Sequence, residues 1–132
     1  MGIIMDFWNI GKDLFDVSDK FKEAEKDRKE AASKLFNAIG DVLKDTYEKL
    51  LHQTYPAGNC QQLLLYGHQL YDKTKDVIGE EKAHELAEKI LAAHKVEQLY
   101  HELENTNTSQ SDLEILDEAS GFFKATANII LL

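Results

Sequence analysis

Mostly apolar side chains recur at steps of three or four over residues 21 to 50, and this spacing constrains the fold more than any other feature. It is the period of an amphipathic α-helix, whereas a half-buried β-strand alternates every second residue. Candidate N-cap residues lie before residue 20, and Pro56 disfavours a helical conformation of the residue that precedes it. Together these signals predict one helix over about 18–54. The stripe runs through Phe21, Ala24, Arg28, Ala32, Leu35, Ile39, Val42, Thr46 and Leu50.

Such a helix would be on the order of 55 Å long, which is longer than a compact bundle of this size needs. We therefore expect Gly40 to bend it or one of its ends to project. The same periodicity predicts three further main helices, over about 60–78, 80–104 and 112–131, and a short helix near the N-terminus. Asn59 with Gln62 resembles a capping box, and Gly79 is placed to end the second helix.

These elements predict an all-α fold, an antiparallel up-and-down bundle of four main helices with a short N-terminal helix. A chain of 132 residues fits one domain, 1–132, with its own core. The single cysteine, Cys60, cannot form an intramolecular disulfide, so we expect a reducing, cytoplasmic location. The opening residues predict neither a signal peptide nor a membrane span.

The chain is acidic, with a formal net charge of -9 and a pI near 4.9. Residues 80–118 carry eleven acidic side chains against three basic ones, so most of the charge lies in the second half. A nucleic-acid surface concentrates basic residues to neutralise phosphates. We therefore do not expect nucleic acid as a partner, and a protein partner or self-association is the expected alternative.

His94, Glu97 and His101 stand where the buried stripe of the predicted helix 80–104 should continue. Imidazole and carboxylate groups at this spacing can converge on a metal ion when a facing helix supplies further ligands. Alternatively, the helix bends or ends near Ala92, and its second half buries Val96, Leu99, Tyr100 and Leu103 on another face. Metal binding through His94, Glu97 and His101 is thus the alternative function.

Enzyme chemistry has little support in the sequence. Cys60 follows the predicted cap, where a helix dipole can lower the pKa of a thiol, but no histidine partner can be assigned to it. No nucleophile elbow, phosphate-binding glycine loop or zinc-finger spacing occurs. We therefore expect a protein that is not an enzyme and needs no cofactor.

The two ends of the chain are its most apolar segments. They either pack on each other and close the bundle, or expose part of their surface to a partner or a second copy. The second alternative predicts a non-enzymatic protein–protein interaction or regulatory module, with a homo-oligomer as one form of it. Its predicted partner-binding residues are Phe7, Trp8, Phe122, Phe123 and Ile130.

Overall fold

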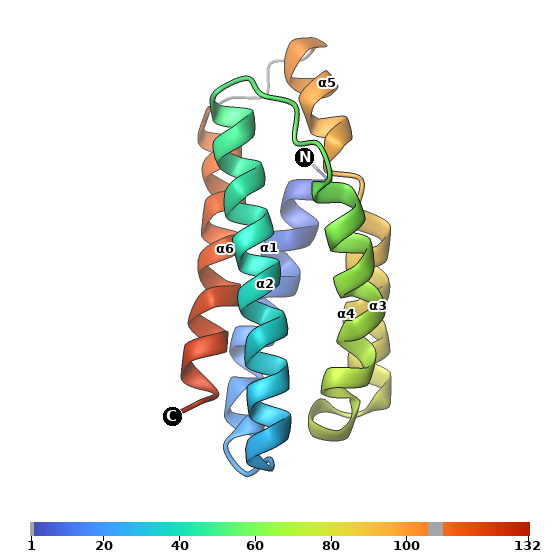
Figure 1. Cartoon of the computed structure of the whole chain (residues 1–132), viewed down its shortest axis with the longest axis vertical. Coiled ribbons are helices and arrows are strands. Elements are labelled where there is room, and N and C mark those ends of the chain that lie inside the picture. Colours follow the sequence, from blue (N-terminus) through green and yellow to red (C-terminus); the bar gives the residue numbers. More distant parts are fainter. Residues whose placement is uncertain (1, 106–109) are drawn as a thin grey trace.

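The computed structural model describes residues 2–105 and 110–132, and no strand occurs among them (Figure 1). The prediction of an all-α helical bundle is confirmed. Its elements are α1 (Gly2–Asp16), the 3₁₀ turn η1 (Ser18–Phe21), α2 (Lys26–Leu51), α3 (Asn59–Ile78), α4 (Glu80–Ala93), α5 (Glu97–Asn105) and α6 (Gln110–Ile129).

The helices form two groups that lie side by side (Figure 1). In the first group, α6 packs against both α1 and α2; in the second, α3 and α4 form a hairpin. The groups meet where α2 contacts α3 and where α1 contacts α4, and α5 extends beyond one end of the hairpin. None of the described helices is both long enough and apolar enough to cross a membrane.

The predicted helix 18–54 is wrong at its start, because residues 18–21 form η1 and α2 begins only at Lys26. Phe21 explains the change of direction. Its side chain is fully buried, and its ring meets that of Phe36 edge-on, with ring centroids 5.9 Å apart. A residue that folds back onto α2 cannot also extend the axis of α2.

Gly40 does not break α2, which is continuous from Lys26 to Leu51. The glycine instead allows α6 to approach. The Ser120 hydroxyl donates to the Gly40 carbonyl at 2.7 Å, and a Cβ at position 40 would lie 3.2 Å from the Ser120 carbonyl oxygen.

The predicted helix 80–104 is wrong as one element, since α4 ends at Ala93 and α5 begins at Glu97. Val96 and Leu99 are both buried. In one continuous helix they would lie on the side opposite the buried stripe of α4. The interruption lets each segment bury its own apolar face. This is the second of the two alternatives that the sequence allowed.

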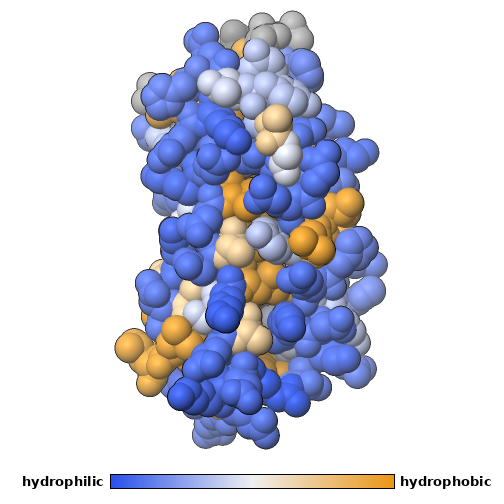
Figure 2. All heavy atoms as spheres, in the orientation of Figure 1, coloured by the Kyte–Doolittle hydropathy of each residue, from blue (hydrophilic) through white to orange (hydrophobic). Residues whose placement is uncertain are grey.

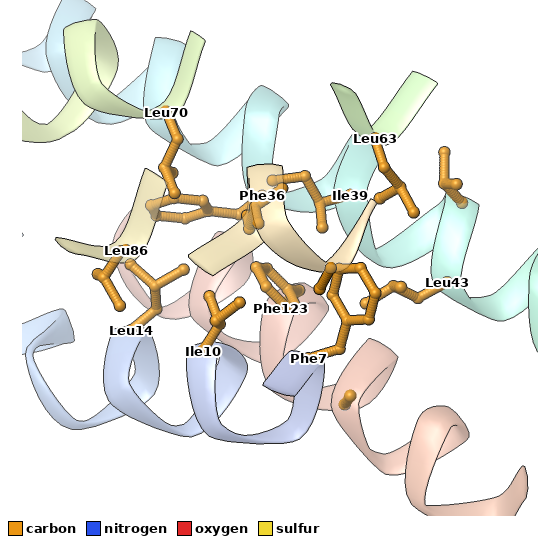
Figure 3. Packing of buried hydrophobic residues seen from close by; sticks show 14 of the residues in the cluster. Phe7, Ile10, Leu14, Phe36, Ile39, Leu43, Leu63, Leu70, Leu86 and Phe123 are labelled. Atoms are coloured by element: carbon orange, nitrogen blue, oxygen red, sulfur yellow. The ribbon is translucent and has the colours of Figure 1, made fainter. Parts of the chain in front are cut away.

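One hydrophobic core joins both groups of helices, and its buried phenylalanines come from α1, η1, α2 and α6 (Figure 3). The ten labelled side chains of Figure 3 are Phe7, Ile10 and Leu14 of α1, Phe36, Ile39 and Leu43 of α2, Leu63 and Leu70 of α3, Leu86 of α4, and Phe123 of α6.

Candidate functional site

The structure brings His94, Glu97 and His101 to one open hollow of about 420 Å³, which we call the junction hollow. It lies where the segment after α2, the start of α3 and the α4–α5 interruption meet. The sequence did not predict that Tyr55 and Cys60 would line the same hollow. The complete lining is Tyr55, Cys60, His94, Lys95, Glu97, Gln98 and His101.

Glu97 attaches α5 to the start of α3. Its Oε1 accepts a hydrogen bond from the backbone N–H of Gly58 at 3.1 Å. Gly58 is the N-cap of α3, where a φ of 85° favours glycine, and glycine has no side chain with which to cap the helix. A carboxylate at a helix N-terminus is also favoured by the helix dipole. The first turn of α5 therefore supplies the cap that α3 lacks.

Asn59 does not act as the predicted N-cap, because it is already the first residue of α3 and its side chain is buried. Its Nδ2 donates to Thr46 Oγ1 at 2.6 Å and to Asp45 Oδ2 at 3.1 Å, while Lys49 donates to its Oδ1 at 3.3 Å. The hydrogen bond from Lys49, and then that from Asn59, lowers the pKa of Asp45. This polar cluster anchors the start of α3 on α2.

The predicted metal site is not assembled by this geometry. His94 lies beyond the end of α4 with its Nδ1 on the Leu91 carbonyl, and Glu97 is engaged by Gly58. His101 packs its ring against that of Tyr55, with centroids 6.0 Å apart. Across residues 2–105 and 110–132, no three or more histidine, cysteine, aspartate or glutamate side chains are placed to hold a metal ion. The three side chains line one hollow, but each is held by a separate contact.

Cys60 is not set up as a nucleophile. Burial, and then the negative charge of Glu97, raises the pKa of its thiol, and the opposing effect of Lys95 is smaller. A reactive cysteine needs the opposite shift, because the thiolate is the nucleophile. Among the residues that line the junction hollow, Glu97 attaches α5 to the start of α3.

Three of the five predicted partner-binding residues are inaccessible. Phe7, Phe123 and Ile130 are all buried in the core, so the prediction that they form a docking surface is corrected. Trp8 and Phe122 are half-buried and meet edge-on, with ring centroids 5.5 Å apart. The two ends of the chain thus pack on each other through α1 and α6, which was the other alternative.

A second site, which the sequence analysis missed, is an open groove of about 440 Å³ between α2 and α3. We call it the α2–α3 groove. Figure 2 shows an apolar strip down this face of the molecule, flanked by hydrophilic side chains. The helical spacing of its residues is present in the sequence. The alanines, however, lie beside a stripe of leucine and isoleucine, and their small side chains alone do not indicate a groove. Its lining is Asp27, Glu30, Ala31, Lys34, Leu35, Ala38, Tyr66, Gln69 and Lys73.

Replacing Glu97 by alanine is expected to loosen α5 without unfolding the bundle. The Gly58 N–H loses its acceptor, and a missing cap costs about 1 kcal/mol. Because α5 extends beyond the bundle, the loss should appear as local opening. Hydrogen exchange should show α5 amides exchanging about fivefold faster, and Gln98→Ala on the same helix is the matched control. Equal exchange in the two variants would show that Glu97 does not attach α5.

Comparisons of the chain with known protein families, with curated proteins and with solved structures gave no match.

Proposed function

We propose that this chain is a non-enzymatic module that binds another protein through the outer side of α3 and the α2–α3 groove. The observation that carries the proposal is the exposure of two consecutive leucines in the middle of the chain. Leu64 is 37% exposed and Leu65 is 54% exposed, whereas Leu63 beside them is fully buried. Leu65 directly precedes Tyr66, which lines the groove.

Three consecutive leucines cover about 200° of a helix surface, since each residue advances by about 100°. A helix with one buried face needs apolar residues over only about half of that arc, and a helix that is apolar on several sides normally packs on several sides. Only Leu63 faces the core. A pair of exposed apolar side chains beside a groove is a feature of many protein-binding sites.

Two further observations fit a binding module better than an enzyme. The raised pKa of Cys60 keeps the thiol protonated at neutral pH. The junction hollow and the α2–α3 groove are both open to solvent, whereas catalytic sites generally enclose their substrate. A reducing cytoplasmic location and the absence of nucleic acid among the partners are part of the same proposal.

Replacing Leu65 by aspartate is expected to abolish partner binding while the fold survives. The side chain is more than half exposed, so the free energy of unfolding should change by less than about 0.5 kcal/mol. Capture of the partner from lysate of the source cells should fall at least about tenfold, because a charge replaces a desolvated anchor. Asn128→Asp, at an exposed site on α6, adds the same charge elsewhere and should capture normally. Equal capture by both variants would contradict the proposal.

A further inference from the structure

Contacts between α2 and α3 hold the two walls of the α2–α3 groove in place. The inference below rests on the proposed function. At one end Arg28 of α2 forms an ion pair with Asp76 of α3, and at the other Asn59 bonds to Asp45 and Thr46. These contacts set the two helices antiparallel. They also place Lys34 of α2 and Lys73 of α3 within about one helical turn of each other along the groove.

The floor of the groove is shaped for side chains two turns apart. Ala31 and Ala38 stand seven residues apart on α2, with the larger Leu35 between them, and the ring of Tyr66 stands on the facing helix. Seven residues advance a helix by about 10 Å, so the two alanines leave matching recesses at that spacing. A bound helix that presents apolar residues at i and i+7 would fill both recesses.

The middle of the groove carries two ammonium groups that form no ion pair within the described part of the chain. Lys34 and Lys73 line opposite walls, and neither forms an ion pair with any residue in 2–105 or 110–132. Lys34 lies between the two recesses, three residues after Ala31 and four before Ala38. A carboxylate placed between two apolar anchors would meet both lysines.

We propose that the occupant of the α2–α3 groove is an amphipathic helix of a partner protein, with an acidic residue between two apolar anchors at i and i+7. The net charge of -9 does not oppose this occupant. The acidic excess lies in residues 80–118, on α4 to α6, whereas the groove carries two acids and two bases. Of its acids, Glu30 faces Lys26 at 3.9 Å, and Asp27 lies in the first turn of α2, about two turns from Lys34. The two lysines therefore select an acidic group at the centre of the groove.

Two synthetic helical peptides test the proposal directly. Both carry leucine at i and i+7, and they differ only in having glutamate or lysine at i+4; a hydrocarbon staple on the opposite face keeps both helical. Binding to the full chain is measured by fluorescence anisotropy, and the site is mapped by amide chemical shifts. We expect the glutamate peptide to bind at least about tenfold more tightly than the lysine peptide, with shifts along residues 31–38 and 66–73.

Charge reversal on the protein should invert this preference. The variant Lys34→Glu/Lys73→Glu should favour the lysine peptide, whereas Lys20→Glu/Lys22→Glu makes the same charge change outside the groove and should keep the original ranking. Circular dichroism melts establish that both variants are folded. Because all four lysines are exposed, the melts should match that of the unaltered protein.

Equal binding of the two peptides, binding of neither, or shifts confined to Trp8 and Phe122 would overturn the inference. So would concentration-dependent dimerisation that the groove variant abolishes, because the occupant would then be a second copy of the chain. These failures are separable from failure of the proposed function. If Leu65→Asp still abolishes partner capture when the peptides show no preference, the docking surface stands and only the chemistry of its occupant is wrong.

Discussion

Replacing Phe123 by alanine is expected to lower the free energy of unfolding by about 3–5 kcal/mol, the range for removal of a fully buried aromatic ring. Phe123 lies in the core between α1 and α2 and has no exposed surface (Figure 3). The surrounding helices cannot collapse completely into the space, because α1, α2 and α6 are also fixed by their other contacts. Chemical denaturation monitored by circular dichroism measures the loss.

The neighbouring residue is the matched control for this prediction. Phe122 is only half-buried, so Phe122→Ala should cost about half as much as Phe123→Ala or less. If both substitutions cost under about 1 kcal/mol and both reduce partner binding, the two phenylalanines are docking residues after all. That result would restore the prediction made from the sequence and contradict the closed core.

Replacing Gly11 by alanine is expected to destabilise the protein by about 1–3 kcal/mol, because it forces α1 away from α6. An added Cβ would lie 3.0 Å from the Phe122 Cβ and 3.2 Å from the Ala119 carbonyl oxygen. The Ala119 carbonyl oxygen belongs to the backbone of α6, so no change of rotamer can move it. Thermal and chemical denaturation should both report the loss.

A second glycine separates this steric effect from helix propensity. An added Cβ on Gly121 in α6 would have no atom within 4 Å outside its own helix surroundings. Gly121→Ala should therefore stabilise the protein by about 0.5–1 kcal/mol, the ordinary advantage of alanine over glycine in a helix. Stabilisation by both substitutions would show that α1 and α6 do not meet closely at Gly11.

Local periodicity predicted where the helices lie, because each helix must bury one face whatever its neighbours are. Periodicity could not predict the ends that depend on distant contacts. The helix α2 begins later than predicted because Phe21 packs on Phe36. The helix α4 ends earlier than predicted because Val96 is buried on another face. The spacing of apolar residues along the chain does not predict either contact.

The candidate sites were harder to predict for a related reason. An apolar chain end has the same composition whether it closes the core, as Phe7 and Ile130 do, or meets a partner. Glu97 was noticed as a possible metal ligand, but its acceptor role depends on Gly58, thirty-nine residues earlier. The α2–α3 groove depends on two alanines whose small size matters only once α3 lies opposite.

The docking surface on α3 is tested most directly by photo-crosslinking in native lysate of the source cells. A photoreactive phenylalanine analogue replaces Leu65 in one variant, Trp8 in a second and the exposed Asn128 in a third. We expect one protein adduct from position 65 that excess unaltered chain competes away, and no competed adduct from position 8 or 128. A competed adduct from position 8 with none from position 65 would place the interaction on α1 and α6 and contradict the account.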